Sequence, residues 1–240
     1  MSKQIGNFAE SYLAAIERLT GRSENGNAII ESSRPGLPPV TVLFFNDWPV
    51  AGVLSAFTLG VSLGSHVEEI GGHPELVVSL ETTDRRWALA LGVLAEQARD
   101  QAMLSIGSTL DMPAPITDGS PMTGFMLTRP HHLDGADICF RVDDRDVVIL
   151  EAHPVLPSEL VLARQSRAEL SKRLFGARYD VNRAPITGTM SMDPGVESGL
   201  APRPVERPGK QRTFRCRICS FESEDSSYCP ECLADTMIPG

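Results

Sequence analysis

Apolar residues recur every three or four positions near the start and in the middle of the chain, which is the spacing of an amphipathic helix. In the first segment the stripe is Phe8, Tyr12, Ile16 and Leu19. Asn7 and Glu10 have the spacing of a capping box before it, and Gly21 is placed to end it. In the second segment, residues 84–105, the stripe is Trp87, Leu91, Leu94 and Ala98. Residues 157–175 also predict helix, with Leu170 and Leu174 just after a second capping-box spacing.

Between these helices lie short runs rich in Val, Ile, Leu and Phe, which predict strands. They are residues 40–45, 53–63, 75–82, 122–128, 138–142 and 147–152. Residues 46–49 predict a hairpin or a longer turn between the first two runs, and Asp143 and Asp144 predict a turn between the last two. Because strands outnumber helices, and helices begin and end the region, we expect an α/β domain with a mixed sheet packed against helices.

The pattern changes after Tyr179. Proline and glycine become frequent and apolar periodicity is lost, so this stretch buries too little surface to offset its chain entropy. The expected organisation is an α/β domain over residues 1–179, a flexible linker over 180–212 and a small separate module over 213–240.

Four cysteines near the C-terminus occur as two C-x-x-C pairs, Cys216 with Cys219 and Cys229 with Cys232. Each pair lets a tight turn direct two thiolates at one point, and two pairs complete a tetrahedral site. The spacing predicts one structural zinc ion per chain, with no coordination position left for catalysis. Iron in a rubredoxin-like site and a pair of disulfides are the competing interpretations. The cysteine pattern of residues 213–240 resembles the zinc-ribbon family, so we expect a small zinc ribbon there. Phe214 and Tyr228 can pack over its metal.

Charge and hydropathy narrow the function classes. The net charge is −9 and the pI is about 5.1, which disfavours nucleic acid as a partner of the main domain, because phosphate backbones are bound by basic faces. No stretch approaches the length of about 20 apolar residues that a membrane helix needs, and the N-terminus lacks a signal-peptide core. We therefore expect a cytoplasmic protein, a compartment where paired cysteines bind metal more often than they form disulfides.

Histidines and acidic residues suggest further metal sites, but with little support from their spacing. His66 with Glu68, Glu69 and His73 lacks the helical i, i+4 spacing of a catalytic zinc site, and so do the adjacent His131 and His132. We expect both groups to be solvated loop residues. Asp143, Asp144 and Asp146 are expected to form a hairpin turn, with a divalent ion as the alternative.

Two other side chains have a structural and a functional interpretation. Cys139 lies in the apolar run of Ile138 and Phe140, which predicts a buried cysteine that acts as a small hydrophobe. Trp48 is either an exposed contact residue or packed across its own hairpin. The sequence contains no G-x-S-x-G, no phosphate-binding glycine loop and no dinucleotide fingerprint.

The order of elements over residues 40–176 resembles the Suppressor of fused family. Residues 57–62 (FTLGVS) resemble that family's early strand with its threonine-x-glycine-x-serine pattern. The next strand, residues 75–80, is followed at the usual distance by Trp87. The later elements of the resemblance are residues 106–110, 115–116, 122–130 and 148–160.

This resemblance implies a Suppressor of fused-like α/β fold and a non-enzymatic domain that binds proteins. Animal members sequester a transcription factor, and bacterial members are thought to act as immunity proteins that neutralise toxins. The animal proteins have a second folded domain, in place of which this chain has the linker and the ribbon, so no binding residues are carried over. We expect an immunity or antitoxin-like protein that occludes a partner protein. A regulatory adaptor whose ribbon recruits a second protein or nucleic acid is the alternative, and a hydrolase is a distant third.

Overall fold

The structure is a computed structural model, and it describes residues 2–64, 72–99, 104–133, 138–165, 170, 174, 177–186, 214–216, 222–223 and 237–239. The chain divides into two compact units, Met1–Ile186 and Thr187–Gly240. Each unit is described by itself.

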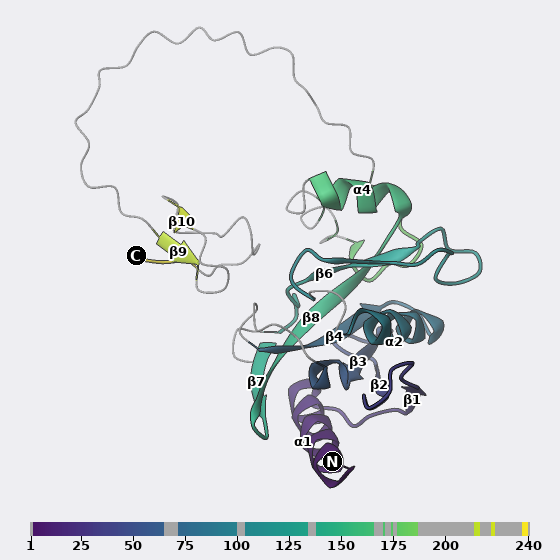
Figure 1. The fold of residues 1–240 in the computed structure, drawn as a ribbon. Coiled ribbons are helices and arrows are strands. Elements are labelled where there is room, and N and C mark those ends of the chain that lie inside the picture. Colours follow the sequence, from purple (N-terminus) through teal and green to yellow (C-terminus); the bar gives the residue numbers. More distant parts are fainter. Residues whose placement is uncertain are drawn as a thin grey trace, which may run out of the picture. The chain divides into compact units, whose positions relative to one another are not determined.

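In the first unit, helices stand near the start, in the middle and at the end of a series of strands (Figure 1). Its helices are α1 (Ser2–Thr20), the short 3-10 helix η1 (Val61–Leu63), α2 (Arg86–Ala98) and α4 (Pro157–Gln165). Its strands are β1 (Asn27–Ile30), β2 (Val40–Asn46), β3 (Leu54–Leu59), β4 (His73–Leu80), β5 (Thr109–Asp111), β6 (Gly124–Thr128), β7 (Cys139–Val142) and β8 (Arg145–Val155). In the second unit, β9 (Phe214–Cys216), β10 (Glu222–Ser223) and β11 (Met237–Pro239) form an antiparallel sheet in the order β10-β9-β11.

The eight strands that the structure describes in the first unit form one mixed sheet, which confirms the predicted fold class. Their order is β1-β2-β3-β4-β8-β6-β5, and β7 also pairs with β8. All neighbours are antiparallel except β4 and β8, which are parallel. The long strand β8 pairs with β4 through residues 147–151, with β7 through 145–148 and with β6 through 151–155. The middle of β8 is therefore where three strand pairings meet.

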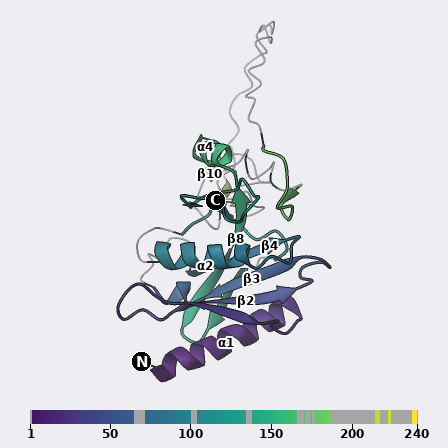
Figure 2. The same cartoon turned by 90° about the vertical axis from the view of Figure 1, so that its right-hand side faces the viewer.

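Helices α1 and α2 lie on opposite faces of β2 and β3 (Figure 2). The stripe predicted for α2 is buried, and the helix approaches the sheet closely at Gly92, where a Cβ would lie 2.6 Å from Val42 Cγ2. Phe8, Tyr12 and Ile16 of α1 are buried as predicted, and the helix ends before Gly21, whose φ is +63°. Helix α4 contacts β6 and covers a second, smaller apolar core formed by Met126, Val155, Leu160, Ala163, Leu170 and Leu174. None of the described helices is long and apolar enough to cross a membrane.

The strands differ from the prediction chiefly at the sheet edges. β1 was not predicted, because a four-residue segment carries too little alternation to be recognised. β5 was predicted as part of a loop, and it has only three residues. The helix predicted to begin near Asn7 begins at Ser2, so Asn7 lies inside α1 and does not cap it. These edge strands and helix ends carry the weakest local signals.

Candidate functional site

One buried carboxylate organises the turn after β3. Glu75 of β4 is fully buried, and its Oε1 accepts hydrogen bonds from Gly60 N at 2.8 Å, Ser62 N at 3.0 Å and Ser62 Oγ at 2.6 Å. Its Oε2 accepts one from Thr58 Oγ1 at 2.6 Å. The threonine-x-glycine-x-serine pattern that carried the family resemblance is therefore a cradle for this carboxylate. Both oxygens of this carboxylate are therefore occupied by hydrogen bonds from the turn after β3.

Position 60 of this cradle requires glycine, because its backbone is left-handed and there is no room for a side chain. Its φ of +116° is one that L side chains rarely adopt, and a Cβ would lie 2.7 Å from Pro39 O. Its carbonyl accepts a hydrogen bond of 2.9 Å from Nη1 of the fully buried Arg99. Arg145 Nη1 donates in the same way to Ser62 O at 2.9 Å. The Glu75 cradle thus links α2, β3, β4 and β8.

A second group of polar side chains, which we call the histidine cluster, consists of His131, His132, Glu151 and His153. Glu151 and His153 are two residues apart and lie on the same face of β8. His131 and His132 come from the segment that follows β6. Oε2 of Glu151 lies 3.1 Å from His131 Nδ1 and 3.8 Å from His153 Nε2. Its other oxygen, Oε1, lies 3.7 Å from His132 Nδ1.

The cluster is almost enclosed by protein. Exposed fractions of the side chains are 1% for Glu151, 2% for His153, 9% for His132 and 20% for His131. Trp48 packs edge-on against the His132 ring, with ring centroids 4.4 Å apart, and Thr128 Oγ1 lies 2.9 Å from His153 Nε2. Solvent therefore reaches the cluster chiefly along His131.

Burial and charge set the protonation of the cluster. Burial opposes ionisation of Glu151, but the charge of His153 and the hydrogen bond from His131 outweigh burial and lower the pKa of Glu151 to about 2. Burial lowers the pKa of His153 to about 4, although Glu151 opposes this shift. Burial likewise lowers the pKa of His132. At neutral pH the carboxylate is ionised, and His132 and His153 are uncharged.

Several polar atoms of the cluster are buried without a hydrogen-bond partner among the described residues. They are Oε1 of Glu151 and both ring nitrogens of His132. One donor atom from each of His131, Glu151 and His153 lies within 4.8 Å of the other two. Imidazole nitrogens and a carboxylate oxygen are a donor set that divalent transition metals accept.

The prediction that His131 and His132 are solvated loop residues is correct in part: both lie in the loop after β6 and His131 is exposed, but His132 is mostly enclosed. Their segment folds back onto β8, where it meets Glu151 and His153. Local spacing does not show this contact, because it joins residues about twenty positions apart. One signal was present in the sequence: Glu151 and His153 alternate within an otherwise apolar strand, and polar residues on the buried face of a strand need partners.

The other histidine group is only partly described. His66, Glu68 and Glu69 lie outside the described residues. His73 is the first residue of β4 and is partly buried, so it is not a loop residue as predicted.

The acidic turn follows the hairpin interpretation. Val142 pairs with Arg145, which leaves Asp143 and Asp144 as a two-residue turn between β7 and β8. Asp143 has a positive φ of 53°, in the left-handed region that such turns use. Asp146 pairs with Arg141 at 3.2 Å.

Cys139 was predicted to be buried, and this was wrong. It lies on β7, where Val142 is buried and Phe140 is partly buried, while Cys139 and Arg141 are exposed. The apolar run concealed this alternation, because neighbouring residues of a strand point to opposite faces. Trp48 packs inside its hairpin, 5.4 Å from the Phe57 ring centroid, and is 7% exposed.

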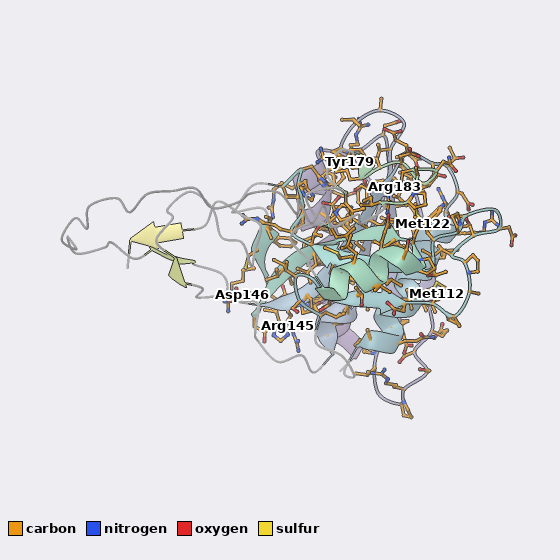
Figure 3. The ribbon with its side chains drawn as sticks, turned by 90° about the horizontal axis from the view of Figure 1, so that it is seen from above. Met112, Met122, Arg145, Asp146, Tyr179 and Arg183 are labelled. Atoms are coloured by element: carbon orange, nitrogen blue, oxygen red, sulfur yellow. The ribbon has the colours of Figure 1, made fainter. Side chains whose placement is uncertain are left out.

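The boundary of the main domain also differs from the prediction. Residues 180–186 were assigned to the linker, yet Arg183 donates to both oxygens of Glu159, at 2.6 Å from Nη2 to Oε2. Ile186 N donates to Glu159 Oε1 at 2.9 Å, and its side chain packs against the smaller core. Figure 3 shows Tyr179 and Arg183 on the same side of the unit, apart from Arg145 and Asp146 at the start of β8.

Of the four predicted zinc ligands, Cys216 is the last residue of β9. Cys219, Cys229 and Cys232 lie outside the described residues, so the zinc site stays a prediction.

Comparisons with known proteins agree on one family. Residues 36–180 match the profile of the Suppressor of fused protein (SUFU) family. The crystal structure of a SUFU homologue from Neisseria gonorrhoeae is similar with a TM-score of 0.57 and 17% identity, over 74% of this chain and 96% of that chain. A chain of the Sufu–Fu complex crystal structure gives a TM-score of 0.51 and 12% identity, over 77% and 90%.

No curated protein matches the sequence. At these identities the structural likeness shows the fold, and the family profile covers more than half of the chain. By this profile match, the chain belongs to the Suppressor of fused family.

Proposed function

We propose that this chain is a non-enzymatic protein-binding module whose first unit covers the surface of a partner protein. Membership of the Suppressor of fused family carries the proposal, since one structure of this fold is a complex of Sufu with the protein Fu. The Glu75 cradle agrees with it, because the most deeply buried acid of the sheet is committed to internal hydrogen bonds.

The contact surface that we propose is the outer edge of β1. This strand ends the sheet order, so its second edge pairs with no other described strand. Ala28 and Ile30 are partly buried, whereas Ile29 is 60% exposed. An open strand edge with an exposed apolar side chain is a template for an added strand from another protein.

The charge of the chain selects the kind of partner. Glu24 and the exposed Glu31 flank the strand, and so do Arg22 and Arg34, so the negative charge is that of the whole chain, which carries a net charge of −9. Like charges oppose pairing of this edge with a second copy, while a basic partner is attracted. The partner that we propose is therefore a basic protein, with a toxin as the specific candidate for an immunity protein.

The test begins with affinity capture by the full-length chain and identification of partners by mass spectrometry, followed by calorimetry with the purified partner. We expect Ile29→Lys to weaken binding at least about tenfold, which corresponds to about 1.4 kcal/mol. The matched control is Val161→Lys on α4, whose side chain is 52% exposed and should tolerate the change. Equal binding by both variants would move the contact away from β1.

An immunity role requires that the chain neutralise a toxic partner in the cell. Co-production of the chain with its captured partner should restore growth that the partner alone inhibits, and Ile29→Lys should lose this protection. A partner that is harmless when produced alone would contradict the immunity role while leaving protein binding intact.

For the second unit, we propose one structural zinc ion held by Cys216, Cys219, Cys229 and Cys232. The spacing of the two C-x-x-C pairs supports this, and so does the three-stranded antiparallel sheet around β9. Cys229→Ser should lose one equivalent of zinc in metal analysis while the thermal unfolding of the first unit is unchanged. Full zinc content in this variant would contradict the assignment.

The second candidate function is an adaptor whose ribbon recruits another protein or nucleic acid. Its support is the division into two compact units, because a tethered second unit raises the effective concentration of a weak contact. If Cys229→Ser abolishes capture of the partner and Ile29→Lys does not, the ribbon carries the binding and the adaptor function replaces the first.

A further inference from the structure

The geometry of the histidine cluster points to a second metal site, distinct from the cysteines of the second unit. We propose that His131, Glu151 and His153 bind one divalent transition metal ion, with zinc as the natural occupant. The proposed site lies in the first unit and does not depend on the protein-binding function.

The spacing of the donor atoms fits such an ion. A tetrahedral zinc ion with bonds of about 2.0–2.1 Å to nitrogen and oxygen keeps its ligand atoms about 3.3–3.5 Å apart. The carboxylate oxygen Oε2 of Glu151 lies 3.1 Å from His131 Nδ1 and 3.8 Å from His153 Nε2. The donor atoms of His131 and His153 lie within 4.8 Å of each other, so side-chain rotation would have to close this third distance to the tetrahedral value.

Burial makes an ion favourable at this position. Glu151 is 1% exposed, and its Oε1 has no hydrogen-bond donor among the described residues. Both nitrogens of His132 are likewise without a partner there, and its Nδ1 lies 3.7 Å from that oxygen. Buried polar atoms without partners lower the stability of the fold. With an ion bound at Glu151, His132 would either become a fourth metal ligand or donate a hydrogen bond to the carboxylate.

Two features limit the affinity. Thr128 Oγ1, 2.9 Å from His153 Nε2, competes with the ion for that nitrogen. Arg178 contributes a positive charge that acts on both His132 and His153. The backbone N–H of His131 also donates to Glu151 Oε2 at 2.9 Å, and an ion bound to His131 Nδ1 would require the ring proton to sit on Nε2.

The expected role of the ion is structural. It would join the segment after β6 to the middle of β8, where β4 and β6 also pair. Trp48 packs on His132, so the β2–β3 hairpin would be held by the same site. Because an ion that binds the folded state alone stabilises it, thermal unfolding should shift upward with metal concentration.

The test uses Co²⁺ on the full-length chain with Cys229→Ser, which disables the ribbon site. We expect one equivalent of Co²⁺ to give weak d–d absorption without thiolate charge-transfer bands, and to raise the Tm. His131→Ala, which alters the most exposed ligand, should weaken binding at least about tenfold. The control, His73→Gln at the start of β4, should bind as tightly as its parent.

A second measurement leaves the histidine cluster unchanged, so its result does not depend on whether a cluster variant folds. In histidine NMR spectra of the same Cys229→Ser chain, Zn²⁺ should shift the ring signals of His131 and His153 and leave those of His73 in place. Absence of both the Co²⁺ bands and the NMR shifts would overturn the proposal. So would equal affinity of the His131→Ala chain, or shifts at His73 alone. In the wild-type chain, thiolate charge-transfer bands of Co²⁺ would report metal binding by the cysteines of the ribbon. The two proposed metal sites are therefore tested separately.

Discussion

At the scale of single residues, a carboxylate inside an apolar sheet requires donors from its surroundings. Glu75 receives them from Thr58 at the end of β3, from Gly60 in the turn that follows and from Ser62 in η1. The left-handed turn at Gly60 reverses the chain, so that Ser62 and Thr58 donate to the same carboxylate. The pattern that resembles the family thus has a local physical purpose.

Thr58→Val should destabilise the first unit by about 1–3 kcal/mol, because a buried acceptor and a buried donor both lose their partner. Thr58 Oγ1 donates to Glu75 Oε2 at 2.6 Å and accepts from Leu76 N at 2.8 Å. The measurement is urea unfolding of the full-length chain. Thr41→Val on the partly buried β2 position is the control and should change stability by less than about 0.5 kcal/mol. Equal effects of the two variants would show that the cradle contributes little.

Cys139 should react with iodoacetamide in the native protein without denaturant, because its side chain is exposed. Burial of part of the thiol and the charge of Asp146 raise its pKa, so the thiolate forms only at higher pH. The labelling rate, followed by mass spectrometry, should therefore rise steadily from pH 7 to pH 9. Cys139→Ser removes this adduct. If labelling occurs only in urea, Cys139 is buried in the native protein, as the sequence predicted.

At the scale of elements, Glu159 determines how α4 begins and how the first unit ends. Its Oε2 accepts from Leu156 N at 2.9 Å, which satisfies a backbone donor at the helix start. The same carboxylate holds Arg183 and Ile186. A helix of nine residues with little amphipathic character is held by this side chain as well as by its packing on β6.

Glu159→Gln should cost on the order of 3 kcal/mol at pH 7, because it leaves the buried Arg183 charge without its partner. Burial opposes ionisation of Glu159, but Arg183 and the backbone donors outweigh it and lower its pKa. Its stabilisation is therefore complete above the unfolded pKa of about 4.3 and is lost as the pH falls through the lower folded pKa. Urea unfolding at pH 7 and pH 3 should show the gap between wild type and variant shrinking at pH 3. The exposed Glu31→Gln is the control, and a gap independent of pH would contradict this role.

At the scale of the whole molecule, the chain consists of two units that meet at residue 186 in sequence. The boundary lies beyond Pro185, the first proline of the stretch that the sequence assigns to the linker, because Arg183 and Ile186 bind Glu159. Composition alone predicted an earlier end of the domain.

Limited proteolysis should therefore leave a fragment that ends beyond Ile186 and not near Tyr179. Trypsin should spare the bond after Arg183 in the wild type, since bound backbone resists cleavage. In Glu159→Gln this bond should become accessible, which intact mass spectrometry of the fragment would show. Cleavage after Arg183 at the same rate in both proteins would mean that residues 180–186 are not held.

The sequence by itself determined the features that depend on near neighbours. Periodicity predicted the three main helices, and turn chemistry predicted the β2–β3 and β7–β8 hairpins, because each is formed by residues close in the chain. The order of short motifs was sufficient to indicate the family, which the profile over residues 36–180 confirms. The zinc ligands stay a prediction of the same local kind.

Only the tertiary structure decided which distant segments meet. The parallel pairing of β4 with β8 creates the buried position of Glu151, and the return of the segment after β6 brings His131 and His132 onto it. The exposed face of Cys139 and the attachment of Arg183 to Glu159 were decided in the same way. Local patterns report the period of an element and the chemistry of its turns. The packing of the whole sheet determines which edge or face each residue occupies.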